Sequence, residues 1–528
     1  MQTRGRGDAE RCQETDLLRM SFPASPRLRV SFLSVTPSPP LPISPSPISL
    51  LSSTIPTMDD AEERNNRQRR HDPYAALRLA DFRLFAIGNI ASVLGNQMTA
   101  VAIGWELYQR TNSATALGLV GFFQLIPLLL LSIPAGQAVD RLDRKSVVVS
   151  SQIILTLSAV VLGLVSLWHD RIPVVGMFEY SNRACSLLAS LLGEKHARFA
   201  DPFVPVLYLV IFVQGAIRAF NQPAKTSLMP MIVPSVIFPN AVTWNSSIQE
   251  TCSMVGPAIG GGIIAVLLRQ PATVSWAYPA VYLLNAVLQC GQSLALLPIR
   301  VIAPPRPHEE ATLKTLTAGL RYVWNDKIIL AALTLDLFAV ILGGATALLP
   351  MFARDILHVG PSGLGWLRAA PSLGAVGMAM MIAHRPPMRH AGKNLLWCVA
   401  GFGAATILFG LSKNFWLSLA MLALTGAFDN VSVVIRHTLV QLRTPDAMRG
   451  RVSSVNAIFI GSSNQLGALE SGVTAAMFGA VASVVLGGVG TLLVVATAVL
   501  LWPEVRRLGA LHESHPVLAG DGQGALGG

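Results

Sequence analysis

Charged residues are scarce in this sequence: they make up 13% of its 528 residues, whereas soluble proteins carry roughly 25%. Apolar residues account for 52% and gather in blocks of about twenty, the length of helix that crosses a bilayer. These two features exclude a soluble multidomain protein. The sequence predicts an all-α integral membrane protein with about twelve transmembrane helices in a lipid bilayer.

Motifs for cofactors and for nucleotide hydrolysis are also missing. The five cysteines have neither metal-site nor disulfide spacing. No Gly-x4-Gly-Lys-Ser/Thr phosphate loop occurs, which argues against ATP-driven transport. We therefore expect neither a metal nor a cofactor.

The net charge of +11 does not indicate a nucleic-acid partner, because the basic residues are spread over short loops between the apolar blocks. Most of these lysines and arginines fall on one side, together with both tails, and such a bias marks the cytoplasmic side. We expect a monomer in the inner or plasma membrane, with both termini in the cytoplasm.

Twelve apolar segments can be assigned in order, and a linker divides them. They span 85–108, 116–139, 147–168, 204–220, 241–268, 280–297, 328–350, 363–383, 395–411, 415–435, 452–472 and 480–501. The Pro-rich linker 299–327, with an amphipathic helix predicted near Thr312–Trp324, separates a six-helix bundle at 58–298 from a second at 328–503. A cytoplasmic tail follows at 504–528.

Residues 1–57 form a low-complexity extension that is rich in Ser and Pro. Proline at this density prevents helix formation, and the segment has too few apolar residues for a core. We predict that it is disordered. Two interpretations stay open: a transit-like segment, or an over-extended start ahead of Met58.

The two halves share a spaced pattern that indicates an internal repeat. In each half an arginine near the end of a span precedes a proline, and an asparagine and a glycine follow that proline at successive intervals of eleven residues. These residues are Arg218, Pro234, Asn245 and Gly256 in the first half, and Arg436, Pro445, Asn456 and Gly467 in the second. Duplicated halves around a central site are how many transporters alternate access.

The loop between spans two and three carries a charged motif, Gly136-Gln-Ala-Val-Asp140-Arg141-Leu-Asp143-Arg144-Lys145. It resembles the signature loop of the major facilitator superfamily, except that Asp143 replaces the second Gly. Gly136 would allow close helix packing, and Asp140, Arg141 and Arg144 would form a charge relay that gates the helix ends. The alternative is an ordinary positive-inside loop.

The fifth span contains Gly256-Pro257-Ala-Ile-Gly260-Gly261. This resembles the antiporter motif of the superfamily, which is associated with export, although Cys252 replaces its first Gly. The alternative is a kinked helix that packs closely through small residues.

Two further stretches, Arg218-Ala-Phe-Asn-Gln-Pro-Ala and Arg449-Gly-Arg-Val-Ser-Ser-Val-Asn456, resemble one branch of the superfamily. It contains enterobactin-exporter-like proteins, also called transmembrane secretion effectors. The resemblance implies a secondary transporter and not an enzyme. We expect a proton-coupled exporter of siderophore-like or drug-like small molecules that works by alternating access.

The sequence allows two alternatives to export. A lipid or lysophospholipid flippase is possible on the same fold. A membrane acyltransferase would use the His-x4-Asp pattern of His196 and Asp201, which stands alone in a short loop and is better explained by chance.

Acids within the spans are the candidates for proton coupling. A charge at bilayer depth costs roughly 2.5–3.5 kcal/mol on insertion scales, so Asp336 and Asp429 are functional candidates. Desolvation lets a buried carboxyl group titrate near neutral pH. The resemblance places both acids, with Asn96 and Gln97, at the central cavity. Arg218 and Arg436 are candidates for gating at the ends of spans four and ten, whereas Glu106, Glu250 and Glu470 are expected to be structural.

Overall fold

The computed structural model describes residues 72–171, 177–194, 197–199, 201–301, 313–385 and 388–509. Within these residues the secondary structure is helical and contains no strand. This confirms the predicted all-α class. The extension at 1–57, Met58 and the prolines of the linker lie outside the described residues.

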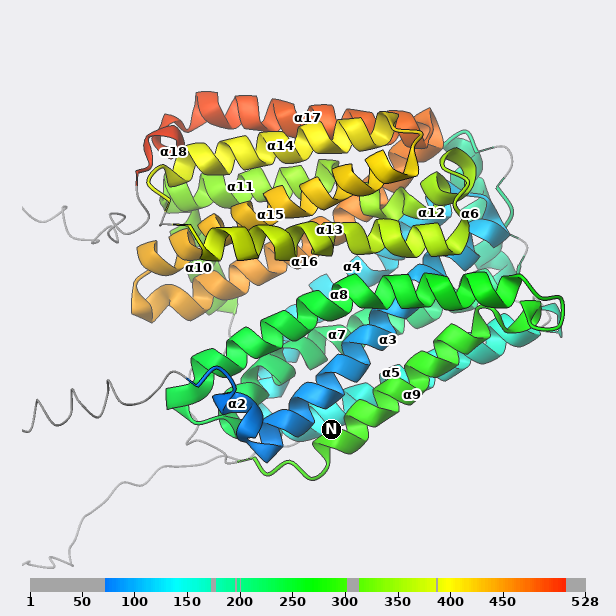
Figure 1. Ribbon diagram of the computed structural model, residues 1–528, viewed down its shortest axis with the longest axis horizontal. Coiled ribbons are helices and arrows are strands. Elements are labelled where there is room, and N and C mark those ends of the chain that lie inside the picture. The colour runs from blue at the N-terminus through cyan, green and yellow to red at the C-terminus, as the bar shows by residue number, and fades with distance from the viewer. Residues whose placement is uncertain are drawn as a thin grey trace, which may run out of the picture. The chain divides into compact units, whose positions relative to one another are not determined.

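The first group of helices contains the six apolar segments of the first half. Its long members are α3 (Ala80–Thr111), α4 (Ala114–Arg141), α5 (Arg144–Trp168), α7 (Phe203–Ile232), α8 (Phe238–Leu268) and α9 (Pro279–Leu296). The short helices α2 (Ala75–Arg78) and α6 (Met177–Leu191) accompany them. Helix α3 packs on α8 and α9, while α7 packs on α4 and α5 (Figure 1).

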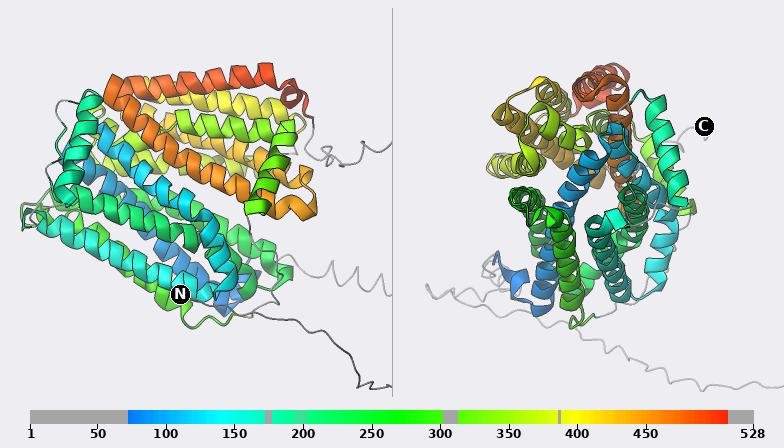
Figure 2. Two further views of the ribbon diagram at one scale, coloured as in Figure 1. Left: turned by 180° about the vertical axis from the view of Figure 1, so that it is seen from behind. Right: turned by 90° about the vertical axis from the view of Figure 1, so that its right-hand side faces the viewer.

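The second group contains the six apolar segments of the second half. Its long members are α11 (Lys327–Leu342), α13 (Gly360–Ala383), α14 (Ala391–Leu411), α15 (Phe415–Arg443), α16 (Asp446–Phe478) and α17 (Ala480–Leu501). Shorter helices are α10 (Leu313–Asn325), α12 (Leu349–Met351) and α18 (Pro503–Arg507). Helix α14 packs on α15 and α17, and α11 packs on α16 and α17 (Figure 2).

Ten helical segments of the described residues are long and apolar enough to cross a membrane. The other two long helices are α9, which carries the amides of Asn285, Gln289 and Gln292, and the more polar α16. Both pack lengthwise on a spanning helix, α9 on α3 and α16 on α4. The set of twelve is consistent with the predicted architecture.

Polar side chains and one glycine define several helix ends. Asp326 accepts hydrogen bonds from the amides of Ile328 and Ile329 and caps α11, and Asn414 caps α15 in the same way. Such caps satisfy amides that have no partner within the helix. Gly479, with φ of 88°, is the single residue between α16 and α17. That positive φ favours glycine, and one residue explains why the sequence separates these two spans poorly.

The seventh predicted span, 328–350, is not one continuous α-helix. Helix α11 ends at Leu342, and a 3-10 turn (Ala345–Leu348), α12 and a π-helical turn (Phe352–Ile356) follow. Gly344 allows the break, because a Cβ on it would lie 2.7 Å from the carbonyl oxygen of Gly467. The break therefore depends on how closely α16 approaches.

Two pairs of helices join the groups, α8 with α13 and α4 with α16. Small residues make both contacts: a Cβ on Gly472 would lie 2.4 Å from the Cα of Gly118, and a Cβ on Gly365 would lie 2.5 Å from the carbonyl oxygen of Pro257. Small residues let helix backbones approach closely in membranes. The contacts therefore depend on the absence of side chains.

Candidate functional site

A cavity of about 600 Å³ lies between the two groups of helices. This is within the range of roughly 300–1,000 Å³ found for small-molecule sites. Helices α3, α4, α5, α7 and α8 supply most of its wall, and the second group supplies the 3-10 turn after α11, α12, α13 and α16. A solute bound there would touch both groups.

Amide side chains are the commonest polar groups on the wall of this cavity. Eleven of its residues are asparagine or glutamine, and Phe85 is the one aromatic residue among those that line it in the described part of the chain. The eleven are Asn89, Asn96, Gln97, Gln124, Gln214, Asn221, Gln222, Asn245, Gln249, Asn464 and Gln465. Amides donate and accept hydrogen bonds, so the cavity suits a polar solute.

The two amides predicted for the cavity, Asn96 and Gln97, both lie on its wall. The amide nitrogen of Gln97 donates to the hydroxyl of Ser253 over 2.8 Å. The oxygen of Asn96 accepts from Gln289 over 3.1 Å, and Asn89 donates to Asn245 over 2.8 Å. These bonds connect α3 to α8 and α9 and fix the orientation of the polar wall.

One face of α7 supplies a polar stripe that the sequence analysis did not identify. Gln214, Arg218, Asn221 and Lys225 all line the cavity. Their spacing of four, three and four residues places them on one side of a helix. That spacing was the signal available in the sequence. Arg218, a candidate for gating at a helix end, also belongs to the cavity wall.

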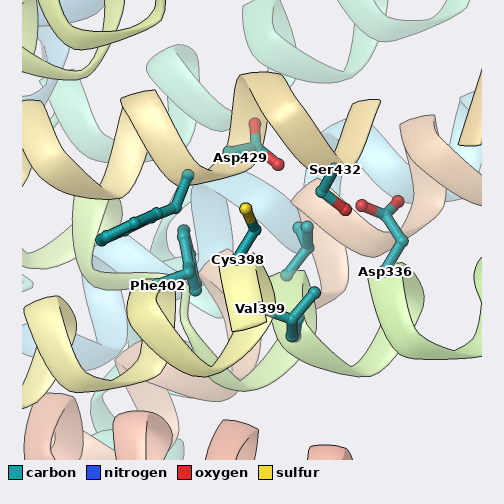
Figure 3. Close-up of a pocket in the computed structure, with 9 residues that line it drawn as sticks. Asp336, Cys398, Val399, Phe402, Asp429 and Ser432 are labelled. Atoms are coloured by element: carbon teal, nitrogen blue, oxygen red, sulfur yellow. The ribbon is translucent and has the colours of Figure 1, made fainter. Parts of the chain in front are cut away.

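The two acids expected at the central cavity lie elsewhere. Asp336 on α11 and Asp429 on α15 line a small void of about 10 Å³ between α11, α14 and α15, together with Cys398, Phe402 and Ser432 (Figure 3). Neither acid belongs to the wall of the larger cavity in the described residues. The reason is rotational: α11 and α15 turn these side chains toward α14. The void has space for about one water molecule.

Asp336 forms an ion pair with Arg436, which lies two turns along α15 from Asp429. The side chains of Arg436 and Asp336 are only 2% and 9% exposed. Buried charges persist in proteins when they are paired. The pair therefore connects α11 to α15 within the second group.

Arg218 and Arg436 occupy matched places in the repeat but have different surroundings. Arg436 is buried against Asp336, whereas Arg218 opens into the cavity and is solvent-accessible. The two glycines of the repeat have similar surroundings, because each packs against a neighbouring helix. Gly256 on α8 packs against Leu94 and Gln97 of α3, and Gly467 on α16 packs against Val340 and Ile341 of α11.

The Gly256–Gly261 motif of α8 packs against two different helices, α3 and α13. A Cβ on Gly256 or Gly260 would lie within 3.0 Å of α3 atoms. Gly261 faces the other way, since a Cβ there would lie 2.3 Å from the carbonyl oxygen of Pro361 at the start of α13. Pro257 lies inside the helix, and its carbonyl group packs against α13 at Gly365. The motif is therefore part of the contact between the groups.

The charged loop between α4 and α5 anchors helix ends. Gly136 and Arg141 lie in the last turns of α4, and Arg144 opens α5. Arg144 donates to the carbonyl oxygen of Ser227 on α7 over 3.4 Å. The side chain of Asp140 lies outside what the structure describes.

Asp143 explains why this loop departs from the signature. Its carboxylate accepts hydrogen bonds from the hydroxyl of Ser146 over 2.7 Å and from the amide of Ser146 over 2.9 Å, so that it caps α5. These bonds, chiefly the hydroxyl bond, lower the pKa of Asp143. A cap stabilises the start of a helix, which a second Gly would do less well.

A buried cluster of charged residues lies at the end of the first group where α3 ends. Glu106, fully buried, accepts from Arg110 over 2.7 Å, from Ser166 over 2.6 Å and from Tyr282 over 2.8 Å. Arg110 also pairs with Asp201 over 2.7 Å. Asp201 thus has a structural partner, while His196, the other residue of the acyltransferase-like pattern, lies outside the described residues.

The same end holds contacts between the groups. The hydroxyl of Tyr108 on α3 donates to Asp355 of the π-helical turn. The guanidinium of Arg354 donates to the carbonyl oxygen of Tyr108 over 3.4 Å and lies over its ring. These polar contacts join the two groups at the end where α3 ends.

Known proteins resemble this chain in sequence. A family model described as transmembrane secretion effector matches residues 71–179 and 182–516. The enterobactin exporter EntS of Shigella boydii serotype 4 (strain Sb227) is 25% identical over 399 residues, which cover 74% of this chain and 92% of the relative. The protein of the same name from Escherichia coli O1:K1 / APEC has the same identity and coverage.

Solved structures of transporters share the fold. A bacterial homologue of the human lysosomal transporter Spinster, in an inward-facing and occupied conformation, has a TM-score of 0.57 at 14% identity and covers 82% of this chain and 99% of its own. A bacterial homologue of the iron transporter ferroportin, in an inward-facing state, has a TM-score of 0.55 at 15% identity, with coverages of 80% and 100%.

Proposed function

Because this chain belongs to the transmembrane secretion effector family of the major facilitator superfamily, we propose that it exports a polar small molecule by alternating access. The chain is a multi-pass membrane transporter and not an enzyme. The observation that carries the proposal of export is the cavity of about 600 Å³ whose wall comes from both groups of helices. A site shared by two groups changes its exposure when one group rocks against the other.

The proposed orientation in the membrane is supported by the distribution of contacts and charge. Contacts between Tyr108, Arg354 and Asp355 join the two groups at the end where α3 ends. The start of α3 and the basic loop between α4 and α5 belong to the opposite end, which we assign to the cytoplasm by the positive-inside rule. The described conformation then faces inward, ready to load a solute from the cytoplasm.

We assign proton coupling to the Asp336–Arg436 pair and not to an acid in the cavity wall. Protonation of Asp336 removes its negative charge and weakens its contact with Arg436 between α11 and α15. A change in this packing biases the position of the second group. The proton would then bind at the small void and the solute in the larger cavity. Asp429 lines the same small void as Asp336.

The charged loop and the motif in α8 complete the proposed transport cycle. We assign Gly136, Asp140, Arg141 and Arg144 to the gate at the cytoplasmic end, where α4, α5 and α7 end or begin. Gly256, Pro257, Gly260 and Gly261 let α8 pack closely on α3 and α13. A lipid flippase gains no support from the cavity, whose wall is rich in amides and poor in aromatic residues.

Export is tested by comparing a deletion strain with the parent strain. We expect the deletion strain to retain a siderophore or another polar metabolite inside the cell, and plasmid-borne protein to restore its release. Purified protein in proteoliposomes should then move that compound against its gradient when a proton gradient is imposed. Unchanged metabolite release by the deletion strain, together with no flux in proteoliposomes, would contradict export.

A further inference from the structure

Three cations open into the cavity and no acid accompanies them. Arg218 and Lys225 of α7 and Arg368 of α13 are its charged residues, and the wall contains no aspartate or glutamate in the described part of the chain. No ion pair or side-chain hydrogen bond joins these three to another described residue. No acid among the residues that the structure describes therefore neutralises the positive charge in the cavity.

The three cations come from both groups of helices. Arg218 and Lys225 are seven residues apart on α7, which places them on one face of the helix and about 10 Å apart along its axis. Arg368 belongs to α13 in the other group. An anion between them would touch both groups at once.

We propose that the transported solute is an anion, with carboxylate, phosphate or acidic phenol groups, that bridges Arg218 and Lys225 on α7 to Arg368 on α13. This inference rests on the proposed export function and names the chemical class of its substrate. The surrounding amides, such as Gln214 and Gln465, supply hydrogen bonds to carbonyl and hydroxyl groups of the same solute. Arginine and lysine are the residues that bind such anions in proteins.

The same arrangement makes the anion a trigger for closure. When the two groups approach, the cations of α7 and α13 repel each other, because all are positive and the described wall residues include no acid to screen them. A bound anion replaces this repulsion with attraction to both walls. Binding therefore favours the closed conformation, and the empty cavity resists closing.

The composition also excludes two other classes of solute. A cationic drug would find no carboxylate in the described wall, and Phe85 is the one aromatic ring available for a cation–π contact. Lipid tails would contact eleven amide side chains of the wall, which offer them no apolar surface. An anionic lipid headgroup shares the proposed chemistry with a free anion, so the experiment must separate these two sources.

A matched pair of dyes tests the sign of the charge. Carboxyfluorescein and rhodamine 123 share a xanthene ring system but carry opposite charges. We expect fluorescence anisotropy with the purified full-length protein to show carboxyfluorescein binding at least about tenfold more tightly, and to show that added salt weakens it. Equal or tighter binding of rhodamine 123, or no binding of carboxyfluorescein, would overturn the proposal.

Substitutions then locate the site. Arg218→Gln, Lys225→Gln and Arg368→Gln should each weaken carboxyfluorescein binding by about tenfold or more, since a hydrogen bond to a charged group contributes that much. The control is Arg385→Gln, an exposed cation outside the cavity, which should bind normally. Arg368→Glu should weaken carboxyfluorescein binding more than Arg368→Gln does, because it adds a negative charge to a wall that still contains Arg218 and Lys225. Unaltered binding in all three glutamine variants, with folding verified by thermal melting, would contradict the site.

Two further measurements are needed. One identifies the source of the anion, and the other distinguishes failure of the anion site from failure of the proposed export function. Competition by phosphatidylglycerol in nanodiscs, absent with phosphatidylcholine, would assign the anion to a lipid headgroup. A lack of competition by phosphatidylglycerol would assign the anion to a free solute. Either result is compatible with the proposed anion site. Dye binding does not require transport. Normal anion binding with no export would reject the exporter, whereas export of a cationic or neutral compound would reject only the anionic class.

Discussion

Gly261 of α8 and Gly365 of α13 lie in direct contact across the boundary between the two groups of helices. A Cβ on Gly261 would come within 3.0 Å of the Cα of Gly365 and 2.3 Å of the carbonyl oxygen of Pro361. The neighbouring Gly262 has no atom within 4 Å of such a Cβ. Two adjacent glycines in one helix therefore differ completely in what a methyl group would meet.

This difference predicts opposite outcomes for two alanine variants. Gly261→Ala should force α8 and α13 apart at a cost of about 1–3 kcal/mol, the usual cost of overpacking. Such a cost shifts a two-state population by about 5- to 150-fold, so turnover in proteoliposomes should fall by at least about fivefold. Gly262→Ala should transport normally. Equal rates in both variants would show that the contact does not limit the cycle.

Substitution of Asp336 tests the proposed coupling. Asp336→Asn mimics the protonated acid and should abolish export driven by a proton gradient, while exchange and downhill flux continue. The physical reason is that Arg436 loses a charged partner whose protonation the gradient controls. The measurement is solute accumulation in proteoliposomes with and without an imposed gradient. Accumulation by the variant, insensitive to collapse of the gradient, would exclude coupling through Asp336.

The two arginines of the repeat should respond differently to the same substitution. Arg436→Gln leaves Asp336 buried and unpaired, which typically costs about 3–5 kcal/mol. Arg218→Gln removes a cation that opens into the cavity and has no acidic partner in the described residues. Thermal melting in detergent should therefore show a large loss for Arg436→Gln and little change for Arg218→Gln. Similar melting temperatures would mean that the ion pair contributes little to folding.

Asp143 should make the start of α5 sensitive to acid. Its pKa is lowered in the folded protein, chiefly by the hydroxyl hydrogen bond from Ser146. The stabilisation is therefore complete above the unfolded pKa of about 3.9 and is lost as pH falls through the lower folded value. Asp143→Ala should lose about 1 kcal/mol at neutral pH. Asp143→Asn should keep most of the cap and lose its share of the pH dependence, as measured by thermal melting from pH 3 to 7.

Cysteine labelling tests the assigned orientation. Arg321 on α10 and Arg269 after α8 are both exposed and lie at opposite ends of the helices. In a background without native cysteines, Arg269→Cys should react with an impermeant maleimide in intact cells. Arg321→Cys should react only after the membrane is opened. The reverse pattern would show that the membrane topology, and with it the proposed direction of transport, is opposite to the one assigned.

The helices could be predicted from the sequence because their signals are local. Runs of apolar residues such as 395–411 have the length of a span whatever surrounds them, and each of the twelve predicted segments falls within a helical region. The seventh is the exception in detail, since its break after Leu342 depends on how closely Gly344 approaches Gly467. That approach involves residues more than a hundred positions apart.

The sequence by itself determined the class of protein, the family and the presence of unusual charges within the spans. The tertiary structure decided where those charges face. Depth along a helix can be counted from the sequence, and it selected Asp336 and Asp429, but the direction around the helix depends on which neighbour covers each face. Packing turned these acids toward α14 and left Arg218, Lys225 and Arg368 at the cavity, because two groups of helices meet there through glycines.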